Sequence, residues 1–175
     1  MDSAQMQVVE LGRLSLRDWA ELVGSEPEPF GGTCARFEFR PKDHHVGLRD
    51  ADGTLVAAGG WTIVHVEIDG HGGFDVIGLG ALIVRHGRRG GGLARPIMER
   101  LRERATAPGI TRRLVLCEPH LEPLYERWGY RPVPDPVWVG QRAGPVRWPL
   151  RTLWRSDSPA VGWPPGVVRI EGFPF

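Results

Sequence analysis

The segment ALIVRHGRRGGGLARPIMERL, residues 81–101, combines three features that together suit an anion. An apolar, strand-like run comes first, the three consecutive glycines Gly90, Gly91 and Gly92 follow, and a helix-like segment begins directly after them. Backbone N–H groups without an intrahelical partner meet the positive end of the helix dipole at such a junction. Because glycine has no Cβ, a phosphate can approach this main chain closely. The sequence therefore predicts a phosphate-binding loop.

The residues beside the glycines support this prediction. Arg89 and Arg95 can add charge-assisted hydrogen bonds to a phosphate, and Pro96 suits a first helical turn, where a missing N–H costs little. Two common phosphate loops are disfavoured. No Lys-Ser or Lys-Thr follows the last glycine, and Arg95 stands where a dinucleotide-binding pattern would place its third glycine. The competing interpretation is a solvated Gly/Arg loop in front of an ordinary helix.

Two short motifs, RGGGLA at residues 89–94 and LYERWGY at residues 124–130, are separated by a helix-like and a strand-like segment. The first resembles the (Gln/Arg)-x-x-Gly-x-(Gly/Ala) signature of the GCN5-related N-acetyltransferases, the GNAT superfamily. The second resembles the Leu-Tyr-x-x-x-Gly-Phe segment of the same family. With the elements around them, the matches span about residues 44–133.

The resemblance implies acetyl-CoA as the acyl donor. In the family's arrangement, the main chain at the end of the strand before the loop hydrogen-bonds the pantetheine arm as a further strand would. The amides of residues 90–95 would then bind the pyrophosphate. The residues implied for donor binding are Leu82, Ile83, Val84, Arg89, Gly90, Gly91, Gly92, Leu93, Ala94 and Arg95.

Tyr125 matches the family's general acid, which protonates the coenzyme A thiolate as it leaves. A phenol of pKa about 10 can donate to a thiolate of pKa about 8.5 when the two are within hydrogen-bond distance. The competing interpretation of Tyr125 is a core aromatic residue on its short helix.

The resemblance does not identify the general base by a matching residue. Many family members have Asn seven residues before the Tyr, and this chain has Glu118 there instead. A carboxylate at the end of a strand could take the proton of the amine through water, or it could simply be solvated or start a helix. The other candidates for the base are Glu38, Glu67, Asp75 and His120.

The pattern of apolar residues predicts the elements that position these side chains. Strands are expected at residues 5–10, 44–49, 54–68, 74–85, 112–117 and 146–155 and from Tyr130, and helices at 16–23, 93–105 and 121–128. Ser15 followed by Asp18 is a start signal for the first helix, and apolar residues recur four apart in the second, at Leu93, Ile97, Leu101 and Ala105. Turns at 50–53 and 69–73 predict an antiparallel meander, and the later strand–helix–strand order predicts parallel pairing. The fold class is therefore α/β of the α+β kind. The resemblance specifies the GNAT fold: a mixed, mostly antiparallel central sheet of about six to seven strands, flanking helices, and a splayed strand pair that holds acetyl-CoA.

The composition is that of one loop-rich globular domain. Of 175 residues, 41% are hydrophobic and 25% charged, and 24 glycines and 16 prolines indicate many turns. We expect residues 1–155 to form a GNAT acetyltransferase domain and residues 156–175 to form a Pro- and aromatic-rich extension packed on it. This extension is expected to cover an exposed sheet edge, and walling the acceptor pocket is the alternative.

Charge and targeting features argue against several partners. With 22 Lys and Arg against 21 Asp and Glu, a net charge of +1 gives no global attraction to nucleic acid or to an anionic membrane. The longest apolar stretch, Val76 to Val84, is far shorter than the roughly 20 residues that span a bilayer. The first residues lack the regions of a signal peptide, and the 2 cysteines form no disulfide framework. A cytoplasmic location is predicted.

The resemblance implies an acetyl-CoA-dependent N-acetyltransferase, and we expect it to act on a primary amine of a small molecule, such as an antibiotic or a related metabolite. No metal and no covalent intermediate is expected, because a neutral amine can attack the thioester directly. Two alternatives stay open: acetylation of a protein amine, and a non-catalytic acyl-CoA-binding regulatory module. Whether the chain is a monomer or a homodimer also stays open.

Overall fold

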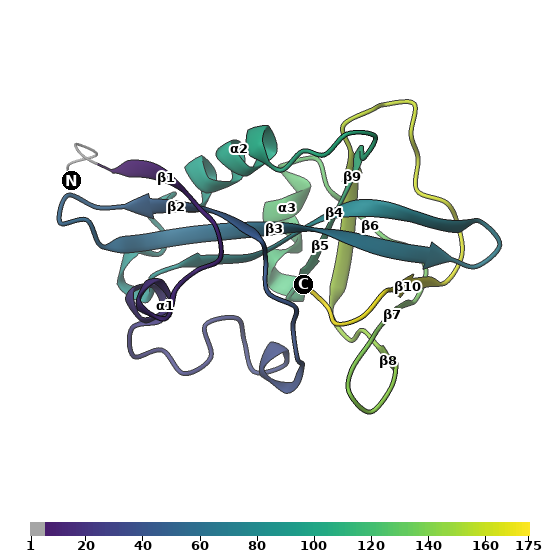
Figure 1. Cartoon of the computed structure of the whole chain (residues 1–175), viewed down its shortest axis with the longest axis horizontal. Helices are drawn as coiled ribbons and strands as arrows, with labels where there is room; N and C mark the ends of the chain where they lie inside the picture. Colours follow the sequence, from purple (N-terminus) through teal and green to yellow (C-terminus); the bar gives the residue numbers. More distant parts are fainter. Residues whose placement is uncertain (1–5) are drawn as a thin grey trace. The chain divides into compact units, whose positions relative to one another are not determined.

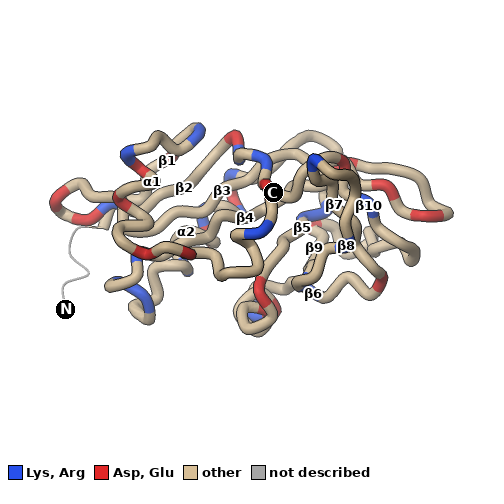
Figure 2. The backbone as a smooth tube through the Cα atoms, turned by 90° about the horizontal axis from the view of Figure 1, so that it is seen from below, with Lys and Arg blue, Asp and Glu red and all other residues tan. Residues whose placement is uncertain are grey.

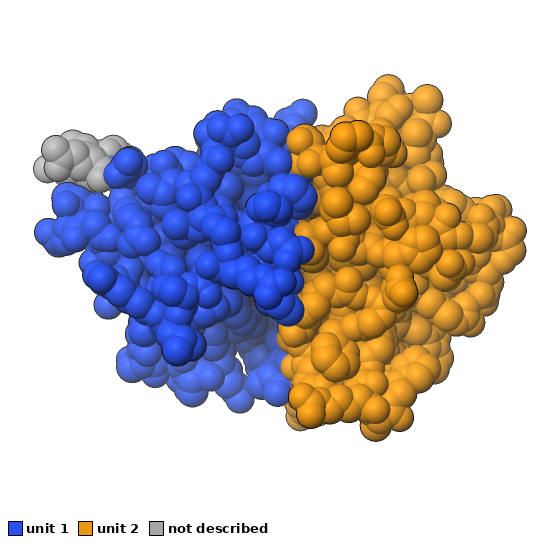
Figure 3. All heavy atoms as spheres, in the orientation of Figure 1, with its two compact units in different colours: residues 1–35, 41–61, 81–105 blue, residues 36–40, 62–80, 106–175 orange. Residues whose placement is uncertain are grey.

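The structure is a computed structural model in which residues 6–175 are described. The chain divides into two compact units (Figure 3). Unit 1 consists of the described residues of 1–35, together with 41–61 and 81–105; unit 2 consists of 36–40, 62–80 and 106–175. Two long strands, β3 (Leu55–Ile68) and β4 (Gly72–Val84), contribute residues to both units. Acidic and basic residues alternate along the backbone without a long run of either sign (Figure 2).

Unit 1 has strands at its centre and one longer helix on each face. Besides parts of β3 and β4 it contains β1 (Gln7–Leu11), α1 (Leu16–Val23), β2 (His44–Arg49), a short 3-10 helix η2 (His86–Arg88) and α2 (Ala94–Arg104). β1 pairs with β2, and β2 with β3, both antiparallel (Figure 1). The antiparallel pairing of β2 with β3 confirms the first half of the predicted meander.

Apolar side chains on both faces of β3 and β4 hold the two helices of unit 1. Leu22 of α1 is fully buried in one cluster with Leu55, Ala58 and Ile83. On the other face, a Cβ added at Gly59 would lie 2.8 Å from Leu101 Cδ1 and 2.9 Å from Ile97 Cγ2 of α2. Close packing of α2 therefore requires a bare backbone at this position of β3.

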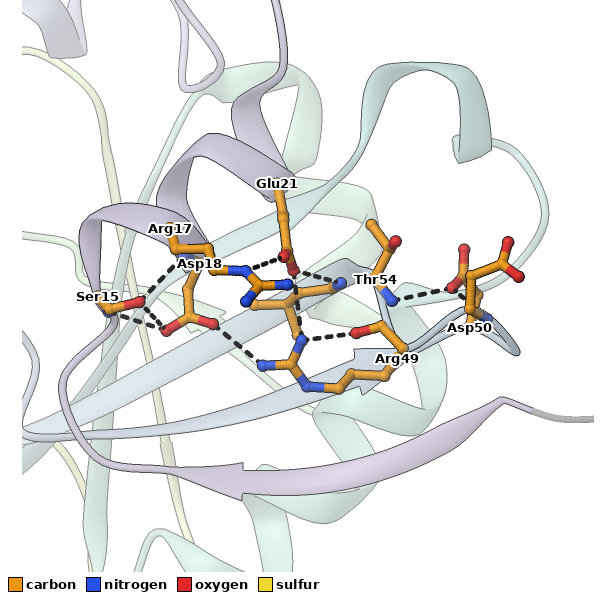
Figure 4. A network of polar contacts seen from close by, with 10 residues as sticks. Ser15, Arg17, Asp18, Glu21, Arg49, Asp50 and Thr54 are labelled. Carbon is orange, nitrogen blue, oxygen red and sulfur yellow. Dashed lines mark hydrogen bonds and ion pairs between the residues drawn. The ribbon is translucent and has the colours of Figure 1, made fainter.

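Polar contacts fix α1 at its start and along its length (Figure 4). Ser15 and Asp18 form a capping box, as the sequence predicts. Arg49 of β2 donates to Asp18 Oδ1 at 3.1 Å and to Glu21 Oε2 at 3.3 Å, and Leu55 N donates to the same Glu21 oxygen at 2.9 Å. The hydrogen bond from the Ser15 hydroxyl is the main cause that holds the pKa of Asp18 below its usual value, and the bond from Leu55 N is the main cause for Glu21. α1 is thus tied to the β2–β3 turn.

Unit 2 is built on a sheet with the strand order β6-β9-β5-β4-β3-β10-β7-β8. β4 pairs with β5 in parallel and β5 pairs with β9 antiparallel, while β10 pairs with β3 antiparallel and with β7 in parallel. The elements that follow β4 in this unit are β5 (Arg112–Cys117), η3 (Pro119–Leu121), α3 (Glu122–Glu126), β6 (Arg131–Pro132), β7 (Val137–Val139), β8 (Val146–Arg147), β9 (Arg151–Ser156) and β10 (Val168–Ile170).

The parallel ladder between β4 and β5 is short. It comprises three residue pairs, Ile77–Leu79 with Arg113–Val115, and both strands continue beyond it. On β4, Ala81 has a φ of 50°, which makes it the one non-glycine residue with positive φ among residues 6–175. A left-handed residue inside a strand bends it and interrupts its regular pairing.

The observed elements confirm the predicted mixed α+β fold and correct some of its details. There are ten strands in the described chain, more than the six to seven expected. The single strand expected at 146–155 is two strands, β8 and β9, because Trp148, Pro149 and Leu150 interrupt it. The helix expected at 121–128 is shorter, with η3 before it. Gln5, placed in the first expected strand, lies outside the described residues.

Segment 171–175 is anchored inside unit 2. Arg40 donates to Phe173 O at 2.9 Å and also to Glu171 O, and its backbone N–H donates to Pro174 O at 2.7 Å. Phe175, which is 3% exposed, packs its ring on Gly78 of β4, where a Cβ would lie 2.7 Å from the ring. The aromatic ring therefore fills the space that a β4 side chain would otherwise occupy.

Phe175→Ala is expected to lower the free energy of unfolding by about 3–5 kcal/mol, because it leaves a cavity over the bare Gly78 backbone. Phe39→Ala is the matched control: Phe39 is 37% exposed and contacts Trp148 edge-on, so a loss of about 1 kcal/mol is expected. Denaturant unfolding measures both. Equal losses for the two variants would contradict a core role for Phe175.

None of the helices in residues 6–175 is long and apolar enough to cross a membrane.

Candidate active site

The end of β4 in unit 1 contains the residues expected to bind the pantetheine arm. The side chain of Ile83 is buried in the cluster beneath α1, and Leu82 lies near Gly59 with the α2 residues. These side chains are thus used for packing. Any ligand bound by this part of β4 would be held by its main chain, as the resemblance implies.

The glycine loop after β4 is open to solvent. Gly90 and Gly92 have φ values of 79° and 76°, which side-chain-bearing residues rarely adopt, whereas Gly91 has no such requirement. Among residues 6–175, no heavy atom lies within 4 Å of a Cβ built at Gly90 or Gly92, and one built at Gly91 meets Arg88 O at 3.5 Å. The main chain of the loop is therefore accessible to a ligand.

Helix α2 starts directly at this loop without a side-chain cap. Leu93 is the N-cap residue and makes no capping hydrogen bond, and Arg95 N donates to Gly92 O at 3.1 Å. Pro96 is the third residue of α2, in the first turn as predicted. The first N–H groups of a helix need partners from outside it. The loop and the uncapped helix start together form a cradle of N–H groups suited to a phosphate.

The arginines of this region are paired with carboxylates. Arg88 lies 3.3 Å from Asp50 Oδ2, and Arg95 lies 2.8 Å from Glu99 Oε1. Arg89 donates to both oxygens of Glu26, and this contact holds the pKa of Glu26 below its usual value. Sequence reasoning missed Glu26, because 63 residues separate it from Arg89 and no local pattern links them.

In unit 2, Tyr125 lies on α3 with its side chain buried, 5% exposed. Its ring contacts Trp128 and Tyr130 edge-on, at centroid distances of 5.8 and 5.7 Å. Gly129, with a φ of 84°, reverses the chain so that Tyr130 N donates to Tyr125 O at 3.2 Å. Burial is the main cause that raises the pKa of Tyr125, with Cys117 nearby as a further one. The phenol is therefore kept protonated.

Glu118 follows β5 directly and is the N-cap residue of η3. Its carbonyl accepts from Leu121 N at 3.0 Å, but its side chain makes no capping hydrogen bond. Glu118 thus stands at a helix start, as one of its competing interpretations has it, but its half-buried side chain does not cap that helix.

Two of the alternative bases are bonded to one histidine on an exposed face of unit 2. His65 Nδ1 lies 2.8 Å from Asp75 Oδ1 and its Nε2 lies 3.0 Å from Glu67 Oε1, and these carboxylates raise the pKa of His65. With Arg169 and Glu171, His65 and Glu67 line a hollow of about 480 Å³. No group of three His, Cys, Asp or Glu side chains in residues 6–175 is arranged to hold a metal ion.

The remaining two candidate bases lie elsewhere in unit 2. The carboxylate of Glu38 is 2.7 Å from Arg142 Nε, and the main chain of Glu38 is bonded on both sides by the amide of Gln141. His120 is exposed on η3. Glu38 thus has a structural partner, and Glu118 is the carboxylate adjacent to the end of β5.

The comparisons with known proteins assign the family. A model of the Acetyltransferase (GNAT) family matches residues 10–130, which is most of the chain and includes both motifs. The chain belongs to the GNAT acetyltransferase family. A comparison with curated protein sequences finds no match.

Solved structures share the GNAT fold at low identity. A GNAT family N-acetyltransferase (YhbS) from Escherichia coli, in complex with CoA, is 15% identical with a TM-score of 0.59, covering 97% of this chain and 92% of that one. The ribosomal-protein-S18-alanine N-acetyltransferase from Escherichia coli is 14% identical with a TM-score of 0.58, covering 91% and 100%. A GNAT acetyltransferase from Brucella melitensis in complex with acetyl-CoA is 16% identical with a TM-score of 0.54, covering 94% of both chains.

Proposed function

We propose that this GNAT protein transfers the acetyl group of acetyl-CoA directly to a primary amine of a small molecule. The observation that carries the proposal is the open Gly90–Gly92 loop at the uncapped start of α2, on a chain that matches the family over residues 10–130. Solved relatives of the same fold hold CoA or acetyl-CoA, which supports the choice of donor.

The residues of unit 1 fit such a donor. The N–H groups of Gly90, Gly91 and Gly92, and of Leu93, Ala94 and Arg95 at the helix start, would bind the pyrophosphate. The main chain of Leu82, Ile83 and Val84 would bind the pantetheine arm. When bound, acetyl-CoA supplies a thioester whose C–S bond breaks as the new C–N bond forms. Direct transfer needs no nucleophile from the protein, so this chain has to bind, orient and move protons.

Two residues of unit 2 are assigned to the proton transfers. Tyr125 gives its phenolic proton to the departing thiolate, and its burial keeps that proton in place before reaction. Glu118 accepts the proton that the attacking amine loses, directly or through water. The phenol regains its proton from solvent after the products leave.

Glu118 and Cys117 lie on different faces of the β5 backbone. Leu114 belongs to the core cluster that includes Phe175 and Leu116 packs against it, whereas Cys117 lies near Tyr125. Glu118 continues the extended backbone of β5, so its side chain is on the face of Leu116, opposite to that of Cys117. A path through water would therefore carry the proton of the amine to Glu118.

The test is calorimetric titration of the purified chain with acetyl-CoA and with CoA, followed by thiol release against a panel of small amines and amine-bearing peptides. Micromolar binding and release with one class of small amine are expected. Release with peptides alone would replace the small-molecule acceptor by a protein amine, and binding without release would indicate a non-catalytic module. No binding would overturn the donor assignment.

A further inference from the structure

Arg89, the first residue of the glycine-loop motif, makes three hydrogen bonds to Val84 and Glu26 inside unit 1, and its Nη1 also lies 3.4 Å from His86 Nδ1. Its Nε donates to Val84 O at 2.9 Å, its Nη1 donates to Glu26 Oε1 at 2.8 Å, and its Nη2 donates to Glu26 Oε2 at 2.6 Å. One guanidinium thus joins the last residue of β4, the start of the loop and the segment after α1. A fork of this kind fixes orientation as well as distance.

Glu26 is itself fixed to the core of unit 1. Its backbone N–H donates to Val23 O at 3.1 Å, directly after α1 ends at Gly24. Further along the same segment, Phe30 packs edge-on against Trp19 of α1. The Glu26 side chain is 19% exposed, so its carboxylate is held at the edge of the packed core instead of moving freely in solvent.

The neighbouring ion pairs lack this geometry. Arg88 and Asp50 make one contact at 3.3 Å, and the Arg95–Glu99 pair joins two residues of α2, with side chains 77% and 60% exposed. An exposed pair such as Arg95–Glu99 contributes little. Arg88–Asp50 also joins separate elements, but of these three pairs only Arg89–Glu26 has two hydrogen bonds to the carboxylate and a third to a backbone carbonyl of β4.

Charge balance decides between two roles for Arg89. Were its guanidinium to turn to a bound pyrophosphate, Glu26 would lose both hydrogen bonds from Arg89 and keep only His86 Nδ1 at 3.8 Å, which leaves a carboxylate close to a second anion. Two negative charges that are held close together repel each other. The pair is therefore better suited to shape the loop than to contact the phosphate.

We propose that Glu26 is a positioning residue for the donor: through Arg89 it holds the glycine loop against the carbonyl of Val84, and the loop amides alone bind the pyrophosphate. This inference rests on the proposed function of the loop. It changes the role that the sequence suggests for Arg89, from a charge-assisted bond to the phosphate to a link between β4 and the segment after α1.

Glu26→Gln tests the inference through donor affinity. The variant keeps the shape of the side chain but loses its charge. Because charge-assisted hydrogen bonds to Arg89 are weakened, the dissociation constant for CoA is expected to rise about tenfold or more. Binding of pantetheine, which has no pyrophosphate, should change less than twofold. At saturating acetyl-CoA, turnover should stay near the wild-type value, so that KM for the donor changes and kcat does not.

Two further variants separate positioning from general damage. In an Arg89→Gln background, adding Glu26→Gln should cause no further loss of CoA affinity, because Glu26 acts only through Arg89. Glu103→Gln removes the same charge from an exposed pair with Arg100 and should leave CoA affinity unchanged. Should Glu26→Gln fold poorly, Glu26→Asp keeps the charge on a shorter side chain, and a weaker rise in the dissociation constant is expected.

The outcomes also separate this inference from the proposed function. A wild-type chain that does not bind CoA overturns the donor assignment itself. A wild-type chain that binds CoA, with unchanged affinity in Glu26→Gln, overturns the role of Glu26 alone. Tighter CoA binding by Glu26→Gln would also overturn it, since Glu26 would then compete with the pyrophosphate for Arg89.

Discussion

Tyr125→Phe is expected to lower turnover by about 10²-fold to 10⁴-fold, the usual range for a lost general acid, and to leave acetyl-CoA affinity within about twofold. The substitution removes one oxygen and keeps the ring that packs edge-on against Trp128 and Tyr130. Without a proton donor, the thiolate has to leave as an anion. Steady-state thiol release and calorimetric titration with acetyl-CoA measure the two effects separately.

Tyr130→Phe is the matched control for this variant. Tyr130 is also buried, its pKa is also raised mainly by burial, and its ring lies beside that of Tyr125. No role in proton transfer is proposed for it, so turnover should stay near the wild-type value. Equal losses in the two variants would mean that the aromatic cluster matters only for packing, and normal turnover in Tyr125→Phe would mean that another group is the acid.

The raised pKa of Tyr125 also sets the direction of the pH dependence. The acid acts in its protonated form, and burial moves its deprotonation above the usual value of about 10. In the wild type, turnover should therefore show no alkaline loss caused by Tyr125 up to about pH 10. A Tyr125-dependent loss near pH 8 would contradict a buried, protonated phenol.

Local signals in the sequence were sufficient for the elements that surround the site. The pairing of Ser15 with Asp18 predicted the start of α1, and apolar residues four apart predicted α2 within one residue at each end. The strand before the glycine loop was predicted from its continuous run of apolar residues. Where spacing along the chain determines structure, sequence reasoning placed the elements correctly.

Features that depend on distant contacts could not be predicted. β7 and β10 are three residues long and pair with each other, β10 also with β3 and β7 also with β8, so periodicity gives no signal for them. The positive φ of Ala81 has no signature in the residue itself. Likewise, the contact of Glu26 with Arg89 arises only when the segment after α1 returns to the loop.

Gly91→Val is expected to weaken acetyl-CoA binding by about hundredfold while the chain folds normally. Gly91 does not need a positive φ, and a Cβ there meets only Arg88 O at 3.5 Å, so the backbone can accept a side chain. The added methyl groups instead occupy the space through which a phosphate would reach the loop amides. Loss of two charge-assisted hydrogen bonds, at about 1.5 kcal/mol each, corresponds to a change of about this size.

Gly87→Val provides the control, because it makes the same change four residues earlier. Gly87 lies in η2 and does not have a positive φ. Among residues 6–175, no heavy atom lies within 4 Å of a Cβ built at Gly87. Gly87 lies outside the loop and helix start that are proposed to bind the pyrophosphate, so the affinity of Gly87→Val for acetyl-CoA should match that of the wild type. Titration of both variants, with thermal unfolding as a check on folding, separates the two positions. Unchanged affinity in Gly91→Val would remove the loop from the donor site, whereas loss in that variant alone would mean that access to the loop main chain is what donor binding requires.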